Sequence, residues 1–242
     1  MGLFSRKKNK VRVRPYTAAV ISAAGSSSRM GGTDKLFAKL LGIPVIAHTL
    51  LAFERSDAIS EIVIASSEQN ILPIGDICRE FDIKKVTHVL RGGATRMESV
   101  YTALLNVSGK AEYAAIHDGA RPLVTTELID SVAACAHKNG AAIPVVPLKD
   151  TIKLLKNGVA VSTPNRADYG AAQTPQVFQL GIIKGAMTRA LEQKLELTDD
   201  ASALERLGMR IQTVAGSLDN IKITTPEDLA VAEALYANRA RI

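Results

Sequence analysis

Hydrophobic positions along the chain alternate between two kinds of segment. Short apolar runs of strand length occur at residues 18–23, 61–66, 86–90, 113–116 and 141–146. Between these runs, apolar residues recur at helical spacing at residues 43–53, 71–81, 94–105 and 125–139, and Gly140 supplies a C-terminal stop for the last of them. This alternation predicts an α/β fold with a doubly wound, mostly parallel sheet in a single domain, residues 16–242.

The alternation is interrupted after Pro147. Residues 148–173 contain two alternating runs on either side of Asn157-Gly158, which is the signal of a tight β-hairpin. We expect this segment to project from the sheet as an arm. Because an exposed hairpin edge can pair with another chain, we also expect a homodimer built through it. Beyond the arm, the pattern predicts a return to the sheet at 174–178, helices at 180–191 and 201–207, a strand at 210–214, an extended segment at 221–223 and a C-terminal helix starting near Pro226.

Composition narrows the class of protein. Hydrophobic residues make up 47% of the chain and aromatic residues only 4%, so the core is built from small aliphatic side chains. Much of the net charge of +6 comes from cations in residues 1–15, which we expect to be a disordered basic extension. The remaining body is nearly neutral, so no nucleic-acid partner is expected. Without a membrane-length apolar run or a signal peptide, and with Cys78 and Cys135 far apart, the expected location is the cytoplasm and no membrane partner is expected.

The loop after the first strand carries the first candidate chemistry. It offers small side chains and accessible backbone amides at Ala23, Ala24, Gly25, Ser26, Ser27 and Ser28. Two cations, Arg29 and Lys35, follow. Bare amides and cations at the carboxyl end of a central strand suit a polyphosphate. The segment matches neither the P-loop nor the dinucleotide fingerprint, and a plain surface turn is the alternative interpretation.

A second strand end carries a carboxylate. Asp118 closes the apolar run that starts at residue 113, and Gly119, Ala120 and Arg121 follow it. A carboxylate at this edge could hold a divalent metal, usually Mg²⁺, that bridges phosphates. The alternative is an Asx-turn or a helix cap, which an Asp before Gly often forms. The nearby arginine favours the phosphate site.

Two further stretches have both a functional and a structural interpretation. Gly92 and Gly93, followed by Arg96 and Ser99, could pack against a flat base and hydrogen-bond its edge. The alternative is an ordinary strand-to-helix turn in which Ser99 bonds to the backbone. Lys222 stands between two isoleucines, so its side chain either extends to the surface or points into a polar site.

Taken in order, these stretches resemble one family of nucleotidyltransferases. The motifs that carry the resemblance are AAGSSSRM with Lys35, RGG with Arg96 and Ser99, HDGARP, Asp150-Thr151, Arg166, TPQ, TDDASALE and DNIKITTPEDL. They are similar to those of the 2-C-methyl-D-erythritol 4-phosphate cytidylyltransferases, which have a Rossmann-like fold, over residues 17–236. The chain departs from the family pattern at Leu36, Ala94 and Gly119, and the departure at Ala94 affects one contact to the nucleotide.

The resemblance implies that CTP and a polyol phosphate, 2-C-methyl-D-erythritol 4-phosphate, are joined with release of pyrophosphate, with Mg²⁺ as cofactor, on the non-mevalonate route to isoprenoids. Arg29 and Lys35 would stabilise the transition state at the triphosphate. Besides residues 23–28, the implied nucleotide contacts are Gly92, Gly93, Arg96, Ser99, Asp118, Gly119 and Ala120. The implied polyol-phosphate contacts are Asp118, Arg121, Thr151, Arg166, Thr174, Thr198 and Lys222, with Arg166 reaching across the dimer from the arm and Asp118 holding the metal.

Three other functions stay open at this point. Ribitol 5-phosphate cytidylyltransferase is a sister enzyme that shares the first loop and the HD-x-x-RP stretch, although TDDASALE favours the methylerythritol enzyme. A non-catalytic Rossmann-type binding module would leave the conspicuous cations Arg29, Lys35 and Lys222 without a role. Nucleic-acid binding would depend on the basic extension and on low salt.

Overall fold

The computed structural model describes residues 14–25 and 34–239, and its centre is a mixed, mostly parallel sheet. The sheet order is β10-β7-β11-β6-β1-β4-β5, and β12 also pairs with β7. These strands are β1 (Thr17–Ala23), β4 (Glu61–Ser66), β5 (Val86–Arg91), β6 (Tyr113–Asp118), β7 (Ala141–Pro147), β10 (Gly170–Ala172), β11 (Gln176–Gln179) and β12 (Gln212–Ala215). The predicted α/β class is confirmed.

The central strand β1 is buried along nearly its whole length, as expected for a parallel strand covered on both faces. It pairs in parallel with β4 on one side and with β6 on the other. The strand β11 runs antiparallel between β6 and β7, which makes the sheet mixed. Because β1, β4, β5 and β6 are parallel, their carboxyl ends meet at one edge of the sheet.

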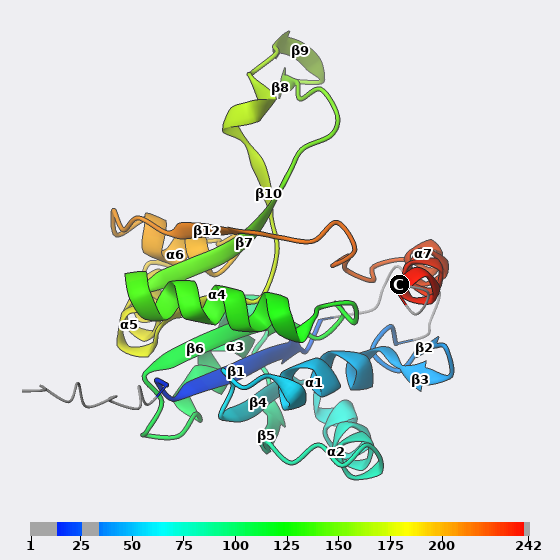
Figure 1. The fold of residues 1–242 in the computed structure, drawn as a ribbon. Helices are drawn as coiled ribbons and strands as arrows, with labels where there is room; N and C mark the ends of the chain where they lie inside the picture. The colour runs from blue at the N-terminus through cyan, green and yellow to red at the C-terminus, as the bar shows by residue number, and fades with distance from the viewer. Residues whose placement is uncertain (1–13, 26–33, 240–242) are drawn as a thin grey trace, which may run out of the picture.

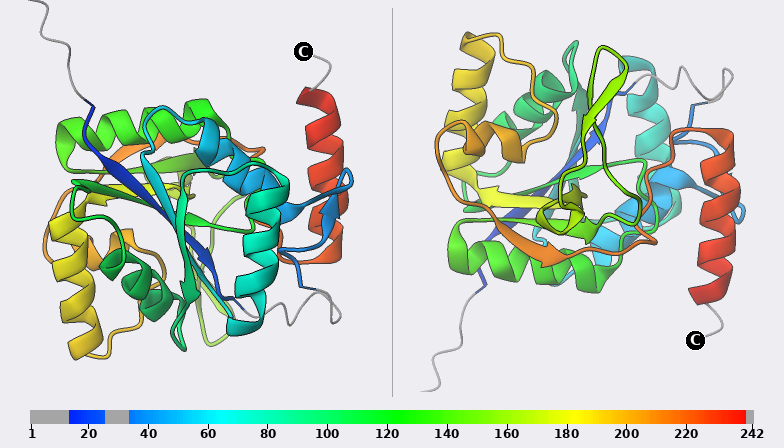
Figure 2. Two further views of the ribbon diagram at one scale, coloured as in Figure 1. Left: turned by 90° about the horizontal axis from the view of Figure 1, so that it is seen from below. Right: turned by 90° about the horizontal axis from the view of Figure 1, so that it is seen from above.

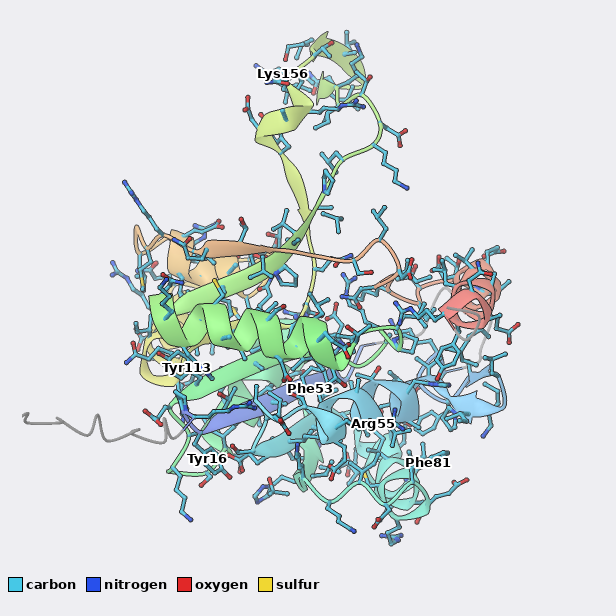
Figure 3. The ribbon with its side chains drawn as sticks, in the orientation of Figure 1. Tyr16, Phe53, Arg55, Phe81, Tyr113 and Lys156 are labelled. Carbon is cyan, nitrogen blue, oxygen red and sulfur yellow. The ribbon has the colours of Figure 1, made fainter. Side chains whose placement is uncertain are left out.

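Helices cover both faces of the sheet, and alternate residues of β1 show how (Figure 2). Ala19 and Ile21 belong to a core shared with α1 (Val45–Arg55), α2 (Ile71–Glu80), α4 (Thr126–Asn139) and α7 (Pro226–Arg239). Val20 belongs to the opposite core, shared with α3 (Arg96–Leu105), α5 (Leu180–Glu192) and α6 (Ala201–Glu205). Phe53, fully buried in the first core, marks where α1 packs on the sheet (Figure 3). The doubly wound arrangement is therefore confirmed.

The predicted arm is present and stands away from the sheet (Figure 1). Its tip is the antiparallel pair β8 (Leu154–Lys156) and β9 (Val159–Ser162), every residue of which is exposed. Asn157 and Gly158 have positive φ of 50° and 79°, as a tight hairpin turn requires. Lys156 lies at the far end (Figure 3). The hairpin signal in the sequence thus identified this element correctly.

Several element ends differ from the sequence prediction by one or two residues, and two of these differences have a clear local cause. The expected helix at 43–53 begins at Val45, because Ile43–Pro44 forms the short strand β3 paired with β2 (Lys39–Leu40). The helix expected at 201–207 ends at Glu205, and residues 206–208 form a turn that closes at Gly208, whose φ is 73°. Residues 221–223, expected as an extended segment, belong to neither a helix nor a strand. No helix in the described ranges is long and apolar enough to cross a lipid bilayer.

Candidate functional site

A cleft of about 260 Å³ lies at the edge where the parallel strands end. Eight of the sequence-predicted nucleotide residues line it together with two further predicted cations, and these are Ala23, Ala24, Gly25, Gly93, Arg96, Ser99, Asp118, Ala120, Lys35 and Lys222. Asp118 is common to both predicted sets, the nucleotide contacts and the polyol contacts. Segments up to about 200 residues apart in the chain therefore share one cavity, as a switch point in an α/β sheet predicts.

Asp118 is the charged centre of this cleft. Its Oδ2 accepts from Lys222 Nζ at 3.0 Å and from Arg121 Nε at 3.3 Å, and its Oδ1 accepts from Arg96 Nε at 3.3 Å. The side chain is only 9% exposed. Burial by itself raises the pKa of Asp118, but the charges of Arg96, Lys222 and Arg121 outweigh it and hold that pKa well below its usual value. Asp118 is therefore ionised throughout the physiological range.

Lys222 points into the cleft because its neighbours fill the core. Ile223 is fully buried and Ile221 packs against the same core cluster, so the residue between them faces the other way. The Ile223 amide donates to the Ala120 carbonyl oxygen at 2.8 Å, which ties this segment to the chain just after Asp118. The Lys222 side chain therefore points into a polar site and does not simply extend to the surface.

Arg121 and Asn220 hold the approach to Lys222 in place. Arg121 Nη1 donates to the Asn220 carbonyl oxygen at 2.7 Å, so Arg121 connects the loop after β6 with the segment before Lys222. Asn220 is completely buried, and its Nδ2 donates to the Thr174 carbonyl oxygen at 2.9 Å. Gln173 Nε2 donates to the Ser217 carbonyl oxygen at 2.8 Å. Gln173 and Asn220 were not among the predicted site residues. Their only signal in the sequence is that Gln173 directly precedes the TPQ motif and that Asn220 lies within the DNIK motif.

Thr174 lies behind Asp118. Its hydroxyl accepts from the Asp118 backbone amide at 3.2 Å and lies 2.9 Å from His117 Nδ1. Since the hydroxyl already accepts from Asp118, we assign its proton to the bond with His117. Burial lowers the pKa of His117 to about 3, so the imidazole is neutral and can accept this proton. The structure thus places Thr174 in the support of Asp118, whereas its predicted polyol contact stays a prediction.

Gly92 lies where neighbouring side chains approach the backbone too closely to leave room for a Cβ. A Cβ on Gly92 would lie 2.5 Å from Ser99 Oγ and 2.9 Å from the Ala24 Cβ. Ser99 Oγ accepts from the Gly93 amide at 3.1 Å and donates to the Thr95 carbonyl oxygen at 2.8 Å. The back-bonded interpretation of Ser99 is therefore correct for this state, although its side chain still lines the cleft.

The start of α3 is fixed by local hydrogen bonds. Thr95 and Glu98 form a capping box, and the Ala94 amide donates to Glu98 Oε2 at 2.7 Å. Arg96, the first residue of the helix, is thereby held at the cleft. The turn that carries Lys35 is held in a similar way, because Asp34 Oδ1 accepts from the Leu36 amide at 3.0 Å and Asp34 Oδ2 accepts from Asn70 Nδ2 at 2.6 Å.

Four further predicted residues, among those that the structure describes, do not line the cleft. Arg166 is on the arm, where it donates to the Lys149 carbonyl oxygen, and Thr151 and Thr198 are exposed. Gly119 packs against β1, with its amide donating to the Ser22 carbonyl oxygen at 2.9 Å. Ser26, Ser27, Ser28 and Arg29 lie outside the described residues.

One residue that sequence reasoning missed completes the cluster. Asp200 is 1% exposed, and its two oxygens accept from Arg96 Nη1 and Nη2, each at 2.8 Å. From the sequence, Asp199 and Asp200 together read as a helix cap. The structure divides them, because Asp199 Oδ1 accepts the Ser202 amide at 3.0 Å whereas Asp200 makes no capping bond. The sequence signal for Asp200 was that two acidic residues follow Thr198, although one acidic side chain is enough to cap a helix.

The charges of the cluster define what it can do. Arg96, Arg121 and Lys222 pair with Asp118 or Asp200, and Lys35 lines the same cleft, so these six side chains carry an excess of two positive charges. No general base that titrates near neutrality stands out among the described cleft residues, because His117 is buried and its pKa is depressed. Such a site favours binding and stabilisation of polyphosphates by fixed charge.

Comparisons with known proteins agree with this chemistry. A family model described as 2-C-methyl-D-erythritol 4-phosphate cytidylyltransferase matches residues 17–238. The Bacillus mycoides protein of that name is 44% identical over 216 residues, which cover 89% of this chain and 95% of the relative. The Halalkalibacterium halodurans protein of the same name is 42% identical over 225 residues, covering 93% of this chain and 98% of the relative.

Solved structures show the same fold. The Anaerococcus prevotii 4-diphosphocytidyl-2C-methyl-D-erythritol synthase superposes with a TM-score of 0.83 at 30% identity, covering 93% of this chain and 96% of that one. The Thermus thermophilus 2-C-methyl-D-erythritol 4-phosphate cytidylyltransferase gives a TM-score of 0.76 at 32% identity, covering 94% of this chain and all of that one.

Proposed function

Because this chain belongs to the 2-C-methyl-D-erythritol 4-phosphate cytidylyltransferase family and is a nucleotidyltransferase of isoprenoid biosynthesis, we propose that the two substrates of that reaction meet in the cleft around Asp118. The observation that carries the proposal is that Arg96, Arg121 and Lys222 converge on one ionised carboxylate while Lys35 lines the same cleft. Two polyanions repel each other, so a site that joins them must supply compensating positive charge.

The reaction is an in-line displacement. A phosphate oxygen of 2-C-methyl-D-erythritol 4-phosphate attacks the α-phosphorus of CTP, and the bond from that phosphorus to the pyrophosphate oxygen breaks. The attacking phosphate is already ionised at neutral pH, which agrees with a cleft built around fixed charges. Catalysis then comes from positioning and from charges that stabilise the transition state.

The charged residues divide this work between the substrates. Lys35, on the turn held by Asp34, would stabilise charge that develops on the triphosphate, together with Arg29. Lys222 would bind the polyol phosphate, because Asp118 fixes its ammonium in the cleft. The cytosine would pack against Gly93, with the backbone of this loop reading its edge.

The donor set fits a Mg²⁺ ion that has a single protein ligand. No group of three or more His, Cys, Asp or Glu side chains suited to a metal occurs in the described part of the chain. Asp118 is ionised and faces the cleft, and Mg²⁺ commonly takes one or two carboxylates, with phosphate oxygens and waters as its other ligands. Asp118 would hold the ion, which when bound neutralises charge on the phosphates.

The arm would complete the site in a homodimer. Leu154, Leu155, Val159 and Val161 on the arm are between 49% and 63% exposed, which is costly for apolar side chains in a monomer. Pairing of two arms would bury these side chains and bring Arg166 of one protomer towards the cleft of the other. Leu155→Asp should therefore yield monomers in analytical ultracentrifugation and lower turnover, whereas a dimer of unchanged affinity would contradict the arrangement.

Substrate choice can be tested directly. Pyrophosphate release should require CTP and 2-C-methyl-D-erythritol 4-phosphate, with little release for UTP, for ribitol 5-phosphate or without Mg²⁺. Faster turnover with ribitol 5-phosphate would favour the sister activity. We also place the protein in the cytoplasm, where CTP is made, which agrees with the free thiols of Cys78 and Cys135.

A further inference from the structure

Asp200 is a buried carboxylate whose charge serves a side chain of the cleft. It lies just before α6, and both its oxygens are taken by the two terminal nitrogens of Arg96 at 2.8 Å. The Arg96 side chain is 33% exposed, so it still reaches the cleft surface. Burial raises the pKa of Asp200 and the Arg96 charge lowers it, so this carboxylate depends on its partner to stay ionised.

The position of Asp200 is set by the sheet. Gln176 of β11 is 1% exposed, its Oε1 accepts from the Ala201 amide at 2.9 Å, and its Nε2 donates to Asp199 Oδ2 at 2.7 Å. These bonds on either side of Asp200 fix its backbone. β11 pairs directly with β6, the strand that ends at Asp118, so the segment that carries Asp200 is held by the strand next to that of Asp118.

The geometry leaves Arg96 little to offer a nucleotide. Its two terminal nitrogens both bond to Asp200, and its Nε faces Asp118 at 3.3 Å. An arginine in a phosphate site normally presents a fork of two donors to the anion. Here that fork is bound by a carboxylate instead.

We propose that Asp200 is a positioning residue that holds Arg96 against Asp118 and keeps its guanidinium from binding the phosphates of CTP and pyrophosphate. The proposal rests on the assignment of the triphosphate to this cleft. The charge of Arg96 stays in the site and helps to stabilise the transition state. Its strongest hydrogen-bond donors, however, are withheld from the bound substrate and the product.

This arrangement serves turnover. Donors that bind substrate and transition state equally lower KM without raising kcat, and tight binding of pyrophosphate slows product release. The Arg96–Asp200 pair also links the start of α3 to residues 198–200. The predicted nucleotide contacts Gly92 and Gly93 lie just before α3, and the predicted polyol contact Thr198 lies in the second segment. One ion pair therefore fixes the spacing of both substrate-binding segments.

Asp200→Asn is the direct test, because it keeps the shape of the side chain and removes its charge. With its fork released, Arg96 should turn to the phosphates. We expect the KM for CTP and the inhibition constant of pyrophosphate each to fall about tenfold or more, which is the effect of one added charge-assisted hydrogen bond, while kcat falls by a similar factor. Loss of a merely structural bond would weaken substrate binding instead.

Two further variants show whether the effect passes through Arg96. In an Arg96→Gln background, Asp200→Asn should no longer tighten CTP or pyrophosphate, because the donor fork is absent. Asp130→Asn is the matched control, since Asp130 accepts from Ser56 Oγ and the Ala58 amide on another part of the surface. It should lower thermal stability and leave KM and kcat unchanged.

Three outcomes would overturn the proposal. These are unchanged kinetics in Asp200→Asn, weaker binding of CTP together with lost stability, and tighter binding that persists without Arg96. Each is distinct from failure of the proposed function, which would appear as full activity in Lys35 and Lys222 variants whatever the behaviour of Asp200.

Discussion

Asp118→Asn tests whether the carboxylate organises the cations of the cleft. The substitution keeps the size of the side chain and removes the charge that Lys222, Arg121 and Arg96 share. Removing one partner of a buried ion pair commonly costs about 3–5 kcal/mol of unfolding free energy, because the other charge is left unpaired. For Asp118, the expected loss depends on which other partners its three cations keep.

None of the three cations would be left without alternatives. Arg96 keeps both bonds to Asp200, Arg121 keeps the Asn220 carbonyl oxygen, and the Lys222 side chain is 37% exposed and can reach water. We therefore expect a loss of about 2 kcal/mol, below the usual range for a buried pair. For a chain of this size, such a loss lowers the melting temperature by roughly 4–8 °C.

The pH dependence of this loss has a definite sign. The folded-state pKa of Asp118 lies below its ordinary value of 3.8, so its stabilising effect is fully present above that value and is lost as the pH falls through the folded-state pKa. The difference in unfolding free energy between the wild type and Asp118→Asn should be constant from about pH 5 to pH 8 and shrink below about pH 4. Urea titrations at a series of pH values measure it.

The activity loss should exceed what the stability loss explains. Without the carboxylate, Lys222 and Arg121 are no longer aimed at the reacting phosphates, so kcat/KM should fall by about a hundredfold or more at temperatures where the variant is folded. Coupled pyrophosphate assays, with circular dichroism to confirm folding, provide the comparison. A variant that is as stable as the wild type, or one with kcat/KM within tenfold of it, would refute this account of Asp118.

Three other predictions concern single residues. Lys35→Ala should lower kcat by about a hundredfold with an unchanged melting temperature, because its charge acts on the transition state; a parallel loss of stability and activity would argue against that role. Lys222→Ala should raise the KM of the polyol phosphate about tenfold more than that of CTP, measured in steady-state assays. A selective loss of CTP affinity would contradict the assignment. His117, whose folded pKa of about 3 lies below its ordinary value of 6.5, binds a proton more readily when unfolded, so stability should fall as the pH drops from 6.5 towards 3. His117→Asn should flatten that slope in chemical unfolding, and an unchanged slope would show that other groups cause it.

Local features of the chain were readable because their causes are local. A run of Ala, Val and Ile between turn residues fits a strand buried on both faces, and β1 is such a strand. Asn157-Gly158 adopts the positive φ angles of a hairpin turn whatever surrounds it. Gly92 was predicted to pack against a base, which stays a prediction; the structure shows that a Cβ there would collide with Ser99 and Ala24.

Contacts between distant segments could not be read in the same way. Asp200 looked like a second capping residue, because nothing near it in sequence shows that Arg96, 104 residues earlier, would reach it. Thr174 looked like a ligand contact, yet its hydroxyl is used by His117 and the Asp118 amide. The partners of Thr174 lie on β6, beside β11, and the partner of Asp200 is the first residue of α3, so both contacts depend on the packing of the whole fold.

The sequence by itself determined the alternation of strands and helices, the projecting arm and the order in which cations and carboxylates follow the strands, because each depends on residues within one turn or one strand of each other. Only the tertiary structure decided which charges neutralise which. An ion pair forms where two backbones bring side chains within about 3 Å, and in a buried cleft that pairing sets the ionisation of Asp118 and the direction of Arg96.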